Sequence, residues 1–168
     1  MKQLLTFMGL VVIGAALVVH GVVGVRADDE SLGGMPSGYP ATDYDQRLTG
    51  VAREAVPIIA TIDSYYARYG HCPRPIPGEL EELQGNLTGG FVATHQGQFT
   101  SIRTPSMISE WLYYVFEGAG RSCTLSRKLG WDPQLIWERD TDGSHWVFDP
   151  GDGSDEKPIQ LKLENPAR

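Results

Sequence analysis

The chain has 168 residues, of which 41% are hydrophobic and 10% aromatic, and its formal net charge is −7. This length gives room for one domain and a targeting segment, and this composition argues against global disorder. The acidic balance argues against nucleic acid and against an anionic membrane surface as partners, because both carry charge of the same sign.

A hydrophobic segment covers residues 4–25, with Lys2 and the amino terminus before it. This charge layout is typical of a secretory leader whose start stays in the cytoplasm. Two outcomes are open: a signal peptidase can cleave after Ala27, or the segment stays and spans a bilayer of about 30 Å. Residues 1–27 are therefore predicted to be a signal peptide or a membrane anchor. The chain is expected in the periplasm or on the periplasmic face of the inner membrane.

A long amphipathic helix is predicted over residues 42–69, because apolar side chains recur there at three- and four-residue spacing. Residues 28–41, rich in glycine and proline, are expected to form a flexible linker before it. Thr42 is the predicted N-cap and Gly70 the predicted stop. Pro57 lies inside the stretch, so we expect one bent helix.

The two cysteines, Cys72 and Cys123, both lie beyond the leader. An even cysteine count in an exported domain predicts a disulfide between them. Two unrelated buried thiols are the alternative. The chain-entropy account gives such a bond a stabilisation of about 4 kcal/mol.

The residue pattern in the second half of the chain is typical of β-strands. Short apolar or alternating runs separated by turn residues begin at Phe91 and continue to Leu163. Residues 79–83 are expected to add one helical turn before them. Because the helix over residues 42–69 has only the sheet to pack against, residues 42–168 are predicted to form one α+β domain. Its antiparallel sheet is expected to have four to six strands.

Four stretches follow one another in a suggestive order: the tyrosine-rich helix end and Gly-His-Cys-Pro turn over residues 62–73, the acidic run 79–83, and residues 111–114 and 123–125. This order resembles the periplasmic domains of type IV pilin-like proteins, and especially the pseudopilins of type II secretion. The resemblance implies a pilin-like fold, with a hydrophobic N-terminal helix and one long helix packed on an antiparallel sheet. It also implies an association with secretion or pilus machinery. Because no acidic residue precedes Asp28, it implies a domain on an anchor or leader and not a filament subunit.

The acidic C-terminal section includes the run over residues 140–144, which looks like the first half of a calcium loop. The predicted ligands are Asp140, Asp142, Asp149 and Asp152, since calcium prefers clustered carboxylate and carbonyl oxygens. Some pseudopilins hold calcium in a C-terminal loop, so the resemblance points the same way. The alternative is a hairpin turn beside a solvated acidic loop. No other cofactor is expected.

Catalytic motifs are missing from the sequence, which has no Gly-x-Ser-x-Gly, His-Glu-x-x-His or phosphate-loop pattern. The chain is therefore predicted to be a non-enzymatic structural or protein-interaction module whose partners are other proteins. The rival hypothesis is a periplasmic hydrolase with a site near His95, Glu110 and His145.

The tryptophans all fall in the strand half of the chain, at Trp111, Trp131, Trp137 and Trp146. Most are expected in the core under the helix. One or two are expected at the surface, where aromatic side chains are enriched at binding sites.

Overall fold

The protein is seen here as a computed structural model, which describes residues 39–106, 109–116 and 121–163. The hydrophobic segment over residues 4–25 and most of the predicted linker lie outside these ranges. Within them, no helix is long and apolar enough to cross a bilayer. The elements are α2 (Gln46–Tyr69), α3 (Glu79–Asn86), β1 (Val92–Gln96), β2 (Phe99–Arg103), β3 (Glu110–Val115), β4 (Cys123–Lys128), β5 (Gln134–Arg139), β6 (Ser144–Asp149) and β7 (Lys157–Ile159).

Helix α2 begins later than predicted, because its N-cap is Asp45 and not Thr42. One carboxylate oxygen of Asp45 accepts two backbone N–H groups of the first turn, at 2.8 and 3.1 Å, and the other accepts the hydroxyl of Tyr39. Tyr44 has a φ of 62°, a left-handed conformation that a right-handed helix cannot include. Its backbone N–H donates to the carbonyl of Gln160 at 2.7 Å. A contact with the far end of the chain therefore sets the start of the helix.

The end of α2 is as predicted. The helix continues through Pro57 to Tyr69 and stops at Gly70, whose φ of 74° suits glycine. Helix α3 is longer than the single turn expected over residues 79–83, and it buries Leu83. Its Gln84 side chain bonds the carbonyl of Phe91 at 3.0 Å and also accepts the N–H of Ala93. Gln84 thereby covers part of the open edge of β1, which would otherwise expose unpaired backbone groups.

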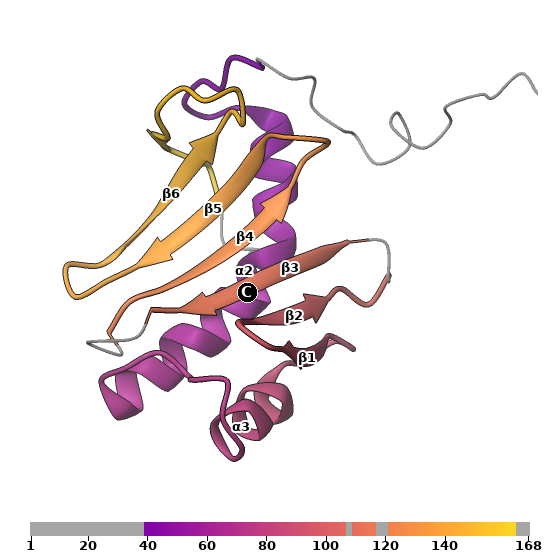
Figure 1. The fold of residues 1–168 in the computed structure, drawn as a ribbon, viewed down its shortest axis with the longest axis vertical. Coiled ribbons are helices and arrows are strands. Elements are labelled where there is room, and N and C mark those ends of the chain that lie inside the picture. Colours follow the sequence, from indigo (N-terminus) through magenta and orange to yellow (C-terminus); the bar gives the residue numbers. More distant parts are fainter. Residues whose placement is uncertain (1–38, 107–108, 117–120, 164–168) are drawn as a thin grey trace, which may run out of the picture.

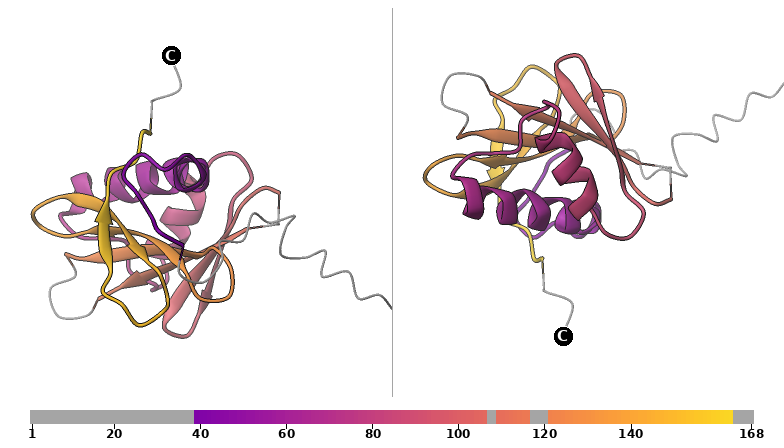
Figure 2. Two further views of the ribbon diagram at one scale, coloured as in Figure 1. Left: turned by 90° about the horizontal axis from the view of Figure 1, so that it is seen from above. Right: turned by 90° about the horizontal axis from the view of Figure 1, so that it is seen from below.

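The seven strands form one antiparallel sheet in which each strand pairs with the next along the chain. Helix α2 crosses one face of this sheet, and α3 lies beside β1 (Figures 1 and 2). Alternation along each strand sends one set of side chains toward α2. The buried members of that set include Trp111, Tyr113, Leu125, Leu135, Trp137, Trp146 and Phe148. They share one core with the apolar stripe of α2.

Two ion pairs join α2 to the sheet at the margin of this core. Arg127 of β4 donates to Glu54 at 2.6 Å, and Arg139 of β5 donates to Asp63. The guanidinium of Arg139 also lies 4.0 Å from the centre of the Tyr66 ring, within the range of a cation–π contact. These contacts fix which face of α2 meets the sheet.

The pilin-like fold expected from the sequence is wrong. The described part of the chain is dominated by a seven-stranded antiparallel sheet with two helices, and it is not a pilin-like long helix on a small sheet. The sheet was expected to have four to six strands and has seven. The outlying strands join it because β2 pairs with β3 as well as with β1, and β6 pairs with β7.

Candidate functional site

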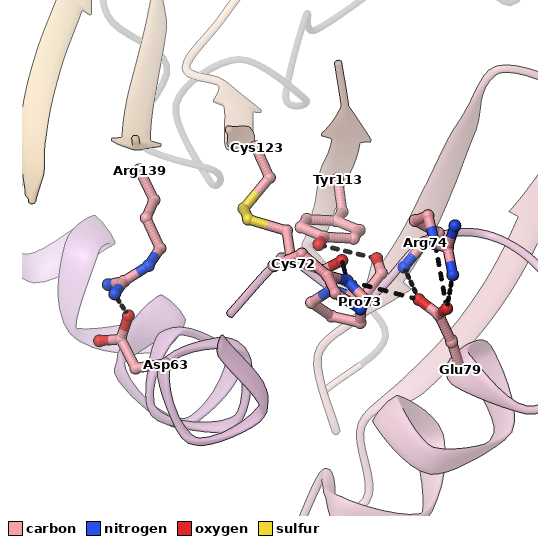
Figure 3. The surroundings of a disulfide bond; sticks show 9 residues. Asp63, Cys72, Pro73, Arg74, Glu79, Tyr113, Cys123 and Arg139 are labelled. Atoms are coloured by element: carbon pink, nitrogen blue, oxygen red, sulfur yellow. Dashed lines mark hydrogen bonds and ion pairs between the residues drawn. A yellow bond between two sulfur atoms is a disulfide. The ribbon is translucent and has the colours of Figure 1, made fainter. Parts of the chain in front are cut away.

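The predicted disulfide is confirmed: Cys72 and Cys123 are bonded, with their Cα atoms 6.2 Å apart. The bond joins the loop after α2 to the first residue of β4, and both cysteines are fully buried (Figure 3). No free cysteine is present among the described residues. The disulfide therefore closes the end of the domain where α2 finishes.

Polar contacts around the disulfide hold the segment that carries Cys72. The hydroxyl of Tyr113, which points at this loop in Figure 3, donates to the carbonyl of Pro73 at 2.9 Å. The backbone N–H of Arg74 donates to the Glu79 carboxylate at 2.7 Å, and the Arg74 guanidinium pairs with the same group. Burial raises the pKa of Tyr65 to about 12, and the charge of Glu79 and a hydrogen bond to it act in the same direction. Every polar group in this cluster is engaged in holding the loop, which indicates a structural role.

Glu79 should make the stability of the domain depend on pH. Burial raises the pKa of its carboxyl, but hydrogen bonds from the side chain and backbone of Arg74, together with the Arg74 charge, leave it below the usual 4.5. A lowered pKa contributes stability that is present above the unfolded pKa and lost as the pH falls through the folded pKa. For Glu79→Gln, we expect lower stability than the parent at about pH 6 and a shallower fall in unfolding free energy between about pH 5 and pH 3.

The measurement is urea unfolding of the full-length protein across that pH range. Glu81→Gln is the matched control, because Glu81 lies on the same helix and is exposed. Parallel pH profiles for Glu79→Gln and the parent would refute the role given to the carboxylate.

The predicted calcium ligands do not converge. Asp140 and Asp142 lie in the turn before β6, whereas Asp149 ends β6 and Asp152 follows it, and a strand of this length spans about 20 Å. Asp140, Asp149 and Asp152 each accept backbone N–H groups from their own turns. Across residues 39–106, 109–116 and 121–163, no three His, Cys, Asp or Glu side chains are grouped as a metal site. Calcium binding stays a prediction that this geometry does not favour.

The three residues of the hydrolase hypothesis are also separated. His95 lies on β1 and His145 on β6, five strand spacings apart, or about 24 Å. Glu110 accepts the hydroxyl of Ser101 on the neighbouring strand, and its carboxylate lies 3.7 Å from Arg103. His145 lies 3.3 Å from Glu138 across the β5–β6 ladder. Glu110 and His145 each have a cross-strand side-chain partner, and the three residues lie on separate strands with no common space between them.

Trp131 differs from the other tryptophans. Trp111, Trp137 and Trp146 are buried in the core, as expected for most of the four. The side chain of Trp131 is 89% exposed, whereas the other exposed large hydrophobic side chains of the described ranges are between 42% and 53% exposed. Sequence patterns did not distinguish Trp131 from the other tryptophans, although Gly130 before it and Asp132-Pro133 after it mark a turn.

The surroundings of Trp131 come from two loops. Trp131 lies in the β4–β5 connection, which is closed by a hydrogen bond of 2.8 Å from the Leu129 N–H to the Pro133 carbonyl. The β6–β7 connection lies at the same end of the sheet (Figure 1), and a Cβ atom placed on Gly151 would be 2.5 Å from the carbonyl carbon of Asp132. We call residues 129–133 and 150–156 together the Trp131 end. It is remote from the disulfide, because Cys123 and Trp131 lie at opposite ends of β4.

Comparison with known proteins identifies no relative of this chain. No protein-family model, no curated protein and no solved structure matches this chain. Among the described residues, Trp131 is the most exposed large hydrophobic side chain, and packing in the core does not explain its position.

Proposed function

We propose that this chain is an exported, non-enzymatic domain that acts by binding another protein. The observation that carries the proposal is the 89% exposure of Trp131. An indole left in water contributes little to folding, whereas burying an aromatic side chain of this size against a partner is worth several kcal/mol, typically about 2 or more at an interface hot spot. Tryptophan is accordingly enriched at the centre of protein interfaces.

Export is supported by two independent features. The hydrophobic segment over residues 4–25 has the charge layout of a leader or anchor. The Cys72–Cys123 bond is of a kind that persists in oxidising compartments. The proposal therefore places the domain in the periplasm or on the periplasmic face of the inner membrane, delivered or held there by its N-terminal segment.

Binding is favoured over catalysis because the candidate catalytic side chains lie apart. His95 and His145 are on strands at nearly opposite edges of the sheet, and Glu110 is paired with its neighbours. An association with secretion or pilus machinery is not part of the proposal, because it was implied only by the pilin-like fold.

The test is site-specific photo-crosslinking in cells of the source organism, with the reactive residue at position 131 of the full-length chain. We expect one discrete product larger than the protein itself. The same residue at exposed Glu81 of α3 should give none, since α3 packs beside β1 and away from the Trp131 end. A chain without residues 4–25 should also give none, because it does not reach the partner. Uncrosslinked monomer alone, or the same product from both positions, would refute the proposal.

A further inference from the structure

The backbone around Trp131 is held by contacts within its loop and with the neighbouring loop. The connection that carries it is closed by the Leu129–Pro133 hydrogen bond, and Pro133 is buried. The backbone of Asp132 rests against Gly151 of the neighbouring loop. The backbone that carries the indole is therefore ordered before binding, and such preorganisation raises affinity.

The same end of the domain is acidic. Its two loops and the adjoining strand ends carry five carboxylates and two lysines, namely Asp132, Asp149, Asp152, Asp155, Glu156, Lys128 and Lys157. Hydrogen bonds from the hydroxyl and backbone N–H of Ser154 lower the pKa of Asp152, which stays ionised at neutral pH. The side chains of Asp155 and Glu156 are exposed and make no hydrogen bond or ion pair with the described residues. Negative charge is thus left without a partner at the same end of the domain as the exposed indole.

We infer that the Trp131 end is a docking surface for a basic segment of a partner protein, one rich in arginine. This rests on the proposed function and names the chemistry of its partner. The face of an indole attracts a guanidinium by cation–π interaction, and the neighbouring carboxylates form ion pairs with it. Complementary charge also speeds encounter and excludes wrong partners. A second copy of the chain would bring the same acidic loops together, and an anionic lipid surface would repel them.

The experiment uses the full-length protein in a nonionic detergent and a short peptide of alternating arginine and glycine as the probe. Binding is followed by calorimetry, with a glutamate–glycine peptide as the charge-reversed control. We expect saturable binding of the arginine peptide, and weaker binding as salt rises from about 0.05 M to about 0.2 M. The glutamate peptide should not bind.

Three variants locate the surface. Trp131→Ala should weaken binding about tenfold or more. Its melting temperature should stay that of the parent, because the side chain makes almost no contact. The pair Asp155→Asn and Glu156→Gln should weaken binding about threefold or more. The control pair Glu81→Gln and Asp142→Asn removes the same charge far from Trp131 and should leave binding within about twofold.

The inference is overturned if Trp131→Ala binds like the parent, or if both charge pairs weaken binding equally, since the peptide would then respond to net charge alone. Its failure is distinct from failure of the proposed function. A crosslinked partner at position 131 whose contact segment is not basic would keep the proposed function and overturn the docking chemistry. Peptide binding centred on Trp131 without a crosslinked partner in cells would keep the docking chemistry and overturn the proposed function.

Discussion

Replacing both Cys72 and Cys123 with alanine is expected to lower the free energy of unfolding by about 4 kcal/mol. The bond joins residues that are 51 positions apart, so it removes much of the freedom of the unfolded chain. Domains of this size are stable by only about 5–15 kcal/mol, so the loss is a large share of the total. Urea unfolding of the full-length protein at 25 °C measures it, and the melting temperature should fall on the order of 15 °C.

Reduction provides the matched control. A thiol reductant strong enough to open the buried bond should destabilise the parent by a similar amount and should leave the double variant unchanged. Cys72→Ala alone should behave like the double variant, because the remaining thiol has no partner among the described residues. A loss below about 1 kcal/mol in all of these would show that the bond contributes little beyond its packing.

The sequence was sufficient to predict the disulfide and most of the secondary structure. Apolar spacing predicted one helix ending at Gly70, and alternation located the runs that became strands. These signals are local: a helical period, a glycine stop and turn residues such as Asp142-Gly143 act within a few residues. The cysteine pairing followed because two cysteines allow only one internal bond, and the expectation of export favoured its formation.

An antiparallel sheet was predicted, but its seven strands and their pairing were not, because strand pairing is a contact between distant residues. Nothing local in residues 99–103 shows that they pair with β3 as well as with β1. The predicted start of α2 was wrong for a related reason. Thr42 and Asp45 are both good N-caps, and the choice is made by Tyr44, whose backbone bonds to Gln160.

The candidate site shows the same division. The sequence predicted that most tryptophans would be buried and one or two exposed. Which tryptophan is exposed depends on the tertiary structure. Trp131 lies in a connection outside the alternation of the strands, so its burial could not be assigned from a period. The acidic residues clustered in sequence were expected to cluster in space, yet β6 separates Asp140 and Asp142 from Asp149 and Asp152.

Gly151 lies where the two loops of the Trp131 end contact each other. Its φ is +69°, and its Cα faces the backbone of Asp132 so closely that a Cβ would lie 2.5 Å from the carbonyl carbon and 2.6 Å from the carbonyl oxygen. Its N–H donates to the Asp149 carboxylate at 2.8 Å, which holds the turn in this conformation. Gly153, two residues on, has a similar φ of +83° but nothing within 4 Å of its would-be Cβ.

Gly151→Ala is expected to lower the unfolding free energy by about 3 kcal/mol. The left-handed backbone accounts for about 1–2 kcal/mol of this, and the overlap with Asp132 adds about 1–3 kcal/mol. Gly153→Ala has only the backbone cost and should lose about 1 kcal/mol. Because the loops must separate to admit the methyl group, Gly151→Ala should also weaken binding of the arginine–glycine peptide, whereas Gly153→Ala should leave it nearly unchanged. Urea unfolding and calorimetry on both full-length variants give the comparison. Equal losses of stability in the two would mean that the loops are not in contact at Gly151, and equal peptide affinities would mean that their contact does not position Trp131.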